Sequence, residues 1–216
     1  MTMHKILYAI TCLSLVASTC GAKPIVFDFE DKKGVNSITF EMDSLLEPIY
    51  GNAAGIAGKV TFNPDLPEQT TGTIVLKASS LHVANKLMNE HMLGKEWMKV
   101  ADFPLVTFTL ERLINVQENG GYYAADAEGR LTILEDTQKI SIPVTINYLK
   151  GRLAERNRVE GDLLVVRGKF RILRETYNIN PGLKLLKVAN EIDIRLGLAG
   201  AAPYPEGTKK TPENKK

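Results

Sequence analysis

Apolar and polar residues alternate strictly along several stretches of this chain, and this pattern constrains the fold more than any other feature. The alternation runs through Ile192–Leu198, Ile140–Tyr148, Val106–Leu110 and Ile38–Met42. Successive side chains of a β-strand point to opposite faces of a sheet, so each run predicts a strand with one apolar and one polar face. Such strands must bury their apolar faces together, and the pattern leaves open whether the protein alone fills that interior.

Nine strands are predicted in all, and segments with turn chemistry separate most of them. The clearest turns are Asn63–Pro67, Glu118–Gly121 and Asn180–Gly182, and Glu135–Gln138 predicts a hairpin connection. No long helical period alternates with the strands, which disfavours parallel βαβ units and leaves an antiparallel sandwich or barrel. The predicted strands cover residues 25–30, 36–42, 57–63, 72–80, 104–115, 122–134, 138–148, 162–174 and 190–198.

One segment, residues 81–98, breaks the alternation and is predicted to form one or two short helices. Ala84, Leu87, Met88 and Met92 are spaced as on one face of a helix. We expect this segment to close one end of a barrel. Methionine adapts its shape to varied apolar partners, so the methionines here are candidates to face a ligand, with ordinary core packing as the alternative. They are Met88, Met92 and Met98.

The beginning of the chain is typical of a secretory signal peptide covering residues 1–22. Lys5 supplies the positive charge, residues 6–17 the apolar stretch, and small residues follow up to a cleavage site near Ala22. We favour this interpretation over lipidation of Cys20, because no large aliphatic residue stands three positions before that cysteine. The protein is therefore expected to be periplasmic or secreted.

The folded domain is predicted to span residues 23–200, followed by a disordered tail rich in lysine and proline over residues 201–216. Both cysteines, Cys12 and Cys20, precede the predicted cleavage site, so no disulfide is expected in the mature protein. The 27 basic and 25 acidic residues are interspersed. A nucleic-acid-binding protein would carry a basic stripe, so that class is disfavoured.

Catalytic and metal-binding motifs are not evident in the sequence. His82 and His91 stand nine residues apart, which is not a spacing that places two ligands on one helix face. The chain has no G-x-S-x-G nucleophile motif and no phosphate-binding loop. We therefore predict no enzymatic activity, no catalytic residue, no metal and no cofactor.

Five stretches follow one another along the chain: Gly55–Asp65, Asn85–Met98 followed by Asp102–Phe108, Leu131–Ile133 with Thr137–Lys139, Gly168–Ile179 and Val188–Ile194. In this order they resemble motifs of the YceI-like family. Two departures stand out: residues 89–92 replace the usual R-D-x-H-L, and Glu135 stands where a turn glycine is usual.

The resemblance implies an all-β, lipocalin-like antiparallel barrel of about eight strands, with the helical segment at 81–98. Its implied ligand is a long apolar chain, such as a polyisoprenoid, a quinone-like molecule or a fatty-acyl chain. Arg174 ends a predicted strand near the proposed mouth and is a candidate to meet a lipid head group, but surface pairing with Glu175 or Asp193 is the commoner arrangement for such an arginine. The candidate ligand-binding residues are Phe62, Met88, Met92, Val106, Phe108, Leu131, Ile133, Ile142, Phe170, Ile172, Arg174 and Ile194.

Three alternatives to a lipid-binding barrel stay open from the sequence. Alternation cannot distinguish an inward from an outward apolar face, so an outer-membrane barrel would show the same pattern, although aromatic girdles are not evident. An enzyme on the same fold would need a polar cluster inside the barrel. A barrel filled by its own side chains would act as a structural or interaction module. The sequence also leaves open whether the protein forms a homodimer.

Overall fold

The computed structural model describes residues 23–182 and 185–205, and most of them lie in antiparallel strands. The all-β prediction is therefore confirmed. The strands are β1 (Ile25–Asp28), β2 (Ser37–Met42), β3 (Ile49–Ala53), β4 (Ile56–Phe62), β5 (Thr71–Lys77), β6 (His82–Val83), β7 (Leu105–Asn119), β8 (Tyr122–Ile133), β9 (Asp136–Leu149), β10 (Gly161–Leu173) and β11 (Glu191–Pro203). The helices are α1 (Lys86–Leu93) and α2 (Leu153–Asn157), and the 3-10 turns are η1 (Pro67–Gln69), η2 (Ala78–Ser80) and η3 (Arg174–Tyr177).

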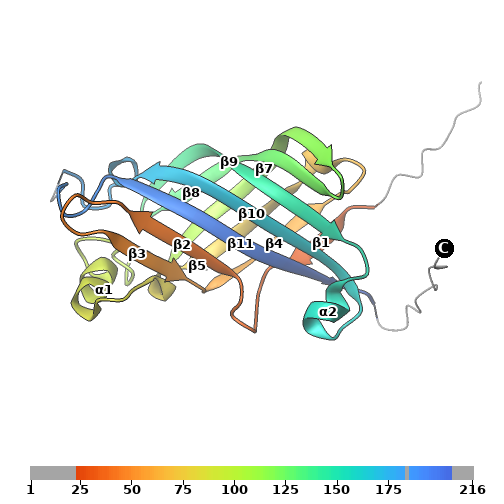
Figure 1. The fold of residues 1–216 in the computed structure, drawn as a ribbon, viewed down its shortest axis with the longest axis horizontal. Helices are drawn as coiled ribbons and strands as arrows, with labels where there is room; N and C mark the ends of the chain where they lie inside the picture. The colour runs from red at the N-terminus through yellow and green to blue at the C-terminus, as the bar shows by residue number, and fades with distance from the viewer. Residues whose placement is uncertain (1–22, 183–184, 206–216) are drawn as a thin grey trace, which may run out of the picture.

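Eight of these strands close into a barrel, as predicted (Figure 1). Their order is β1-β4-β5-β7-β8-β9-β10-β11, and β11 pairs back with β1 where Ala201 lies opposite Asp28. β2 pairs with the other half of β11, with Phe40 opposite Ile194, and β3 and β6 extend the wall from there. Closure leaves the eight strands few unpaired edges, and the extension lengthens the wall at the end of the barrel that carries α1.

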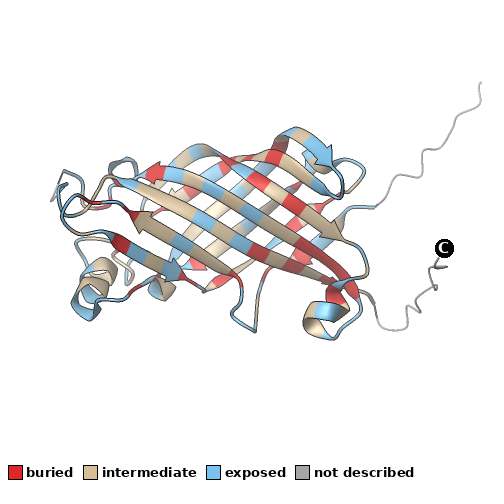
Figure 2. Cartoon of the chain, viewed as in Figure 1, coloured by how far each residue is buried: buried red, intermediate tan, exposed pale blue. Residues whose placement is uncertain are grey.

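The apolar faces of the strands turn inward, which is the choice that alternation alone left open. Along β9, Ile142, Val144 and Ile146 are buried while the residues between them point outward (Figure 2). The outer face carries charged pairs such as Arg112 with Glu128, whose side chains approach to 2.6 Å. No helix in the described part of the chain is long and apolar enough to cross a membrane.

Two strands of the extension, β3 and β6, were missed by the sequence analysis. β6 has only two residues, and β3 has Gly51 at its middle, a residue type that is common in turns. The ring of Phe40 explains that glycine, because a Cβ at position 51 would lie 2.0 Å from the ring carbon Cζ. A residue that looks like a strand breaker therefore makes room for a neighbouring aromatic side chain.

The helical prediction for residues 81–98 was correct only for α1. Asn85 caps this helix by accepting a hydrogen bond from the backbone amide of Met88 at 2.9 Å. The predicted apolar face was partly wrong, since Ala84 precedes the helix and Leu87 is exposed to solvent, whereas Met88 and Met92 are partly buried. His82 belongs to a strand because it pairs with β3, and such a cross-strand pairing leaves no mark in local spacing.

The boundary predicted at residue 200 was placed too early. β11 continues to Pro203 and pairs with β10 along that length, and Ala202 is buried. Tyr204 then donates a hydrogen bond from its hydroxyl to Asp162 at 2.5 Å. The predicted signal peptide, Cys20, and residues 206–216 of the predicted tail lie outside the described residues.

Candidate functional site

The interior of the barrel contains a central cavity of about 170 Å³. Inward-facing side chains from both sides of the barrel line it, including Phe62 on β4, Phe108 on β7, Ile142 on β9 and Phe170 on β10. Thr70 is the single polar residue among the 23 described residues that border this cavity, and its hydroxyl donates to the carbonyl of Pro67 at 2.6 Å. The cavity therefore offers a surface of hydrocarbon, and apolar cavities of this size stay dry and take up apolar molecules.

A second cavity of about 120 Å³ continues the first towards the end of the barrel that carries α1. Five side chains border both cavities, so we treat the two as consecutive sections of one apolar channel. Trp97, Met98 and Arg174 border only the second section. The shared residues are Ile38, Leu76, Val106, Ile133 and Ile194.

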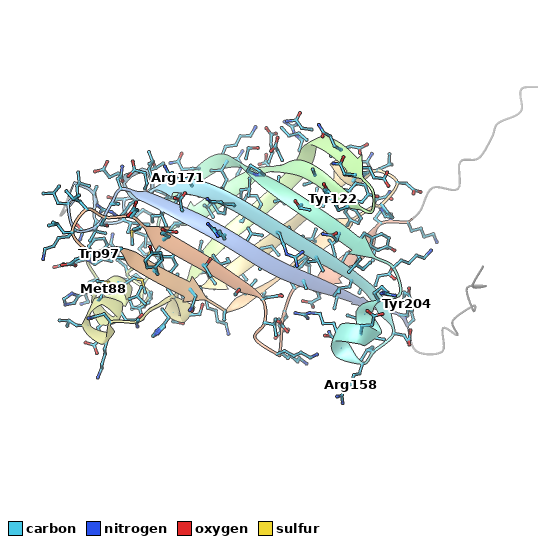
Figure 3. The ribbon with its side chains drawn as sticks, in the orientation of Figure 1. Met88, Trp97, Tyr122, Arg158, Arg171 and Tyr204 are labelled. Atoms are coloured by element: carbon cyan, nitrogen blue, oxygen red, sulfur yellow. The ribbon has the colours of Figure 1, made fainter. Side chains whose placement is uncertain are left out.

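A wider hollow of about 390 Å³ lies next to the channel at the α1 end, and we call it the mouth. Met42, Met92 and Trp97 border both the mouth and the channel. Figure 3 places Trp97 and Met88 together at this end of the molecule, with Tyr204 at the opposite end. Polar side chains appear at the mouth, among them Glu47, His91 and Lys187, so polarity increases from the interior outward.

All twelve residues proposed from the sequence lie on the channel or at its mouth. Eight border the central cavity, Ile172 and Arg174 border the second section, Met92 borders that section and the mouth, and Met88 borders the mouth alone. Which of them contact a ligand stays a prediction. The eight are Phe62, Val106, Phe108, Leu131, Ile133, Ile142, Phe170 and Ile194.

Arg174 does not lie at the surface, so the surface pairing considered for it is wrong. It is 1% exposed, its guanidinium stacks 5.2 Å from the centre of the Trp97 ring, and Asp193 pairs instead with Arg171 at 2.6 Å. η3 turns the chain inward directly after β10, and burial lowers the pKa of the guanidinium from its ordinary value. The backbone carbonyls that accept its hydrogen bonds belong to Ile179 (2.7 Å), Asn180, Val188 (3.4 Å) and Ala189 (3.3 Å).

Several lining residues were not named from the sequence, and Trp97 is the most important of them. It lies in turns that follow α1 and borders both the channel and the mouth. A single tryptophan beside Met98 was the available signal. Ile38 and Leu196 were also missed as lining residues, although both sit at apolar positions of alternating runs, because alternation does not tell which strands border a cavity.

The end of the barrel near α2 is closed by aromatic rings and a hydrogen-bonded carboxylate. The ring of Tyr148 lies 5.8 Å from that of Phe62 and 6.2 Å from that of Phe27. The carboxylate of the buried Asp162 accepts hydrogen bonds from the hydroxyl of Tyr148 at 2.8 Å and from the amide of Gly151 at 2.7 Å, besides that of Tyr204. These contacts join β9, β10 and the segment after β11, so this end is held shut.

We expect alkaline pH to weaken this closed end. Burial, followed by the hydrogen bond to Asp162, raises the pKa of Tyr148, and the same carboxylate raises the pKa of Tyr204 to about 12. An unfolded chain releases both protons near pH ~10, whereas the folded protein retains them. The stability that these groups provide is thus complete below pH ~10 and is lost as the pH rises towards ~12. Urea unfolding across this range measures the loss.

A double variant, Tyr148→Phe with Tyr204→Phe, separates this effect from the deprotonation of lysines. The variant has no phenol at Asp162, so its free energy of unfolding should fall less steeply above pH ~10 than that of the wild type. Equal slopes for the two proteins would contradict the assignment.

The described residues contain no group of three or more His, Cys, Asp or Glu side chains placed to hold a metal ion. His82 and His91 are both exposed, the first on β6 and the second on α1. Of the described residues that border the channel, Arg174 alone carries a charged side chain. The channel is therefore suited to enclosing an apolar molecule.

Comparison with known proteins places the chain among barrels of the same kind. The sequence model of the YceI-like domain family matches residues 31–199. Comparison with functionally curated proteins finds none that matches. BcnA of Burkholderia cenocepacia superposes with a TM-score of 0.63 at 20% identity, covering 76% of this chain and 95% of that one.

Two further solved structures share the fold. The YceI protein of Campylobacter jejuni has a TM-score of 0.58 at 15% identity, covering 71% of this chain and 85% of that one. A domain of Saccharophagus degradans described as polyisoprenoid-binding, and implicated in plant cell wall breakdown, has a TM-score of 0.61 at 11% identity. That alignment covers 84% of this chain and the whole of that domain.

Proposed function

This chain belongs to the YceI-like domain family, and from that premise we propose that it binds a long apolar chain of isoprenoid type inside its barrel, without catalysing a reaction. The observation that carries the proposal is the apolar channel, whose central section is bordered by a single polar residue, Thr70. A channel of this kind can bury a hydrocarbon chain but offers few groups for proton transfer. With the ligand in its channel, the protein would serve as a carrier, store or protectant of that ligand.

Burial of hydrocarbon is sufficient to account for useful affinity. Each methylene removed from water contributes about 0.8 kcal/mol, so ten buried methylenes contribute about 8 kcal/mol before the cost of association is deducted. The lining of β10 alone runs from Leu164 to Ile172, about 26 Å along the strand at ~3.3 Å per residue. We therefore expect the protein to select ligands by the length and cross-section of their apolar chain more than by their polar groups.

An isoprenoid is the favoured ligand within this class. Methyl-bearing Ile and Val residues line much of the channel, which suits a methyl-branched chain. The Saccharophagus degradans domain, described as polyisoprenoid-binding, supports this choice by its shared fold. Quinone-like molecules and fatty-acyl chains belong to the same class of long apolar ligands and would compete for the channel.

We further propose that the protein acts in the periplasm or outside the cell, after cleavage near Ala22. The pattern of residues 1–22 supports this proposal, together with the absence of cysteine from the sequence after Ala22. The intact mass of the protein from its native host tests it. A chain beginning at Lys23 agrees with cleavage, while a chain beginning at a lipid-modified Cys20 would assign it to a membrane anchor.

Ligand extraction from the natively produced protein tests the proposed function most directly. We expect native mass spectrometry to show a species heavier than the polypeptide, and organic extraction to release a prenyl lipid in near-equimolar amount. The delipidated protein should then rebind farnesol or a longer prenol, with a change in Trp97 fluorescence. Repeated failure to recover or rebind any apolar chain would instead favour a barrel filled by its own side chains.

A further inference from the structure

Among the described residues, five leucines that are at least half exposed gather at the end of the barrel where the channel has its mouth. Large apolar side chains in contact with water mark interaction sites when they occur together. Each of these side chains is between 50% and 80% exposed. We call the set the leucine rim, and it consists of Leu45, Leu46, Leu87, Leu185 and Leu186.

Hydrogen bonds hold the two loops of the leucine rim side by side. The backbone amide of Leu46 donates to the carbonyl of Leu186 at 3.0 Å, and the amide of Ala189 donates to the hydroxyl of the buried Ser44 at 2.8 Å. Lys187 and Glu47 form an ion pair across the same junction at 3.3 Å. These contacts join the loop between β2 and β3 to the segment before β11. They keep Leu45 and Leu46 of the loop close to Leu185 and Leu186 of the segment.

The leucine rim reaches the opening of the apolar channel through Leu87 and through Glu47 and Lys187, the sequence neighbours of Leu46 and Leu186. Leu87, Glu47 and Lys187 line the mouth, and Met92 and Trp97 connect that hollow with the channel. At the opposite end, Asp162 and its tyrosines hold the barrel shut. A chain that enters or leaves the channel along its length therefore passes the leucine rim.

The chemistry of the leucine rim fits a lipid bilayer. The rim offers aliphatic side chains, and the exposed Tyr50 at the start of β3 follows Leu46 closely in the sequence; leucines with an aromatic ring nearby are typical of surfaces that lie in the membrane interface. Lys86 stands directly beside Leu87 in the sequence, where it can meet lipid phosphates while the leucines enter the acyl region, whereas the charge of Lys187 is paired with that of Glu47. Leucines of this kind insert readily because burial of each one is favourable.

We propose that the leucine rim docks on the surface of a lipid bilayer, so that an apolar chain passes between the bilayer and the channel without crossing water. This inference rests on the proposed function for its purpose, but the docking itself is a separate property of the surface. A membrane-borne prenyl chain would otherwise have to expose its whole length to solvent during transfer, at about 0.8 kcal/mol per methylene. Docking at the mouth removes that barrier.

Sedimentation with vesicles of phosphatidylethanolamine and phosphatidylglycerol tests the docking. We expect the wild type to pellet with the vesicles, and the variant Leu45→Ser with Leu186→Ser to bind at least about tenfold more weakly, since two inserting side chains are lost. The matched control, Leu66→Ser with Val159→Ser, removes two exposed apolar side chains at the closed end and should bind vesicles as the wild type does.

The remaining outcomes separate docking from ligand binding. The rim variant should bind farnesol from vesicle-free solution with wild-type affinity, as read from Trp97, because the altered side chains lie outside the channel. Wild-type protein that binds farnesol but not vesicles would overturn docking and leave the proposed function standing. Docking is also overturned if the rim variant binds vesicles unchanged, or if light scattering shows the rim joining two copies of the chain.

Discussion

Replacing Ala127 by phenylalanine should abolish tight binding of a long prenol. Ala127 lies on the inner face of β8, between Leu113 on β7 and Ile142 on β9, and borders the central cavity. A phenyl ring at this position would occupy the space that the ligand uses. If it displaces about five methylenes, about 4 kcal/mol of binding free energy is lost, which is close to a thousandfold in affinity. A titration followed by Trp97 fluorescence measures this loss.

The matched control for this variant is Ala124→Phe on the same strand. Ala124 points to the outer face, so its enlargement should leave prenol affinity unchanged. Thermal unfolding of both variants checks that the barrel remains folded, and we expect Ala127→Phe to change stability by less than about 2 kcal/mol because the added ring enters an existing cavity. Prenol binding that is equally tight in Ala127→Phe would place the ligand outside the channel.

Replacing Arg174 by methionine should destabilise the protein strongly and loosen the mouth. The guanidinium holds backbone carbonyls on both sides of the segment between η3 and β11, including those of Ile179 and Ala189. Methionine fills similar space but donates no hydrogen bond, and the buried carbonyls lose a charged donor. We expect the free energy of unfolding to fall by about 3 kcal/mol, since hydrogen bonds to charged groups contribute about 1.5–3 kcal/mol each. Urea unfolding measures this change.

Arg171→Met provides the control, three residues earlier on the same chain. Arg171 is exposed and paired with Asp193 on the outer face, so its replacement should cause little or no destabilisation. Hydrogen exchange adds a local readout: the amides of residues 175–182 and 185–190 should exchange faster in Arg174→Met but not in Arg171→Met. Equal stability of the two variants would show that Arg174 does not hold this segment in place.

The strands and the inward lining were largely predictable because both depend on local alternation. Runs such as Ile140–Tyr148 alternate apolar and polar side chains. A closed barrel provides an apolar interior for the first kind and a solvent-exposed outer face for the second. β3 was not predicted because Gly51 is typical of a turn in the sequence. Only the structure shows that the ring of Phe40 occupies the space beside it. The short pairing at His82 was missed for a different reason, because its partner strand is remote in the chain.

The sequence by itself determined that this chain forms antiparallel strands with one apolar face each, and which residues lie on that face. Only the tertiary structure decided that the faces meet around a channel, that Arg174 turns inward to hold the mouth, and that Asp162 seals the other end. The physical reason is the distance along the sequence between the residues that interact. Alternation is a property of neighbouring residues, whereas closure, the buried hydrogen bonds of Arg174 and the gathering of the leucine rim depend on segments far apart in sequence.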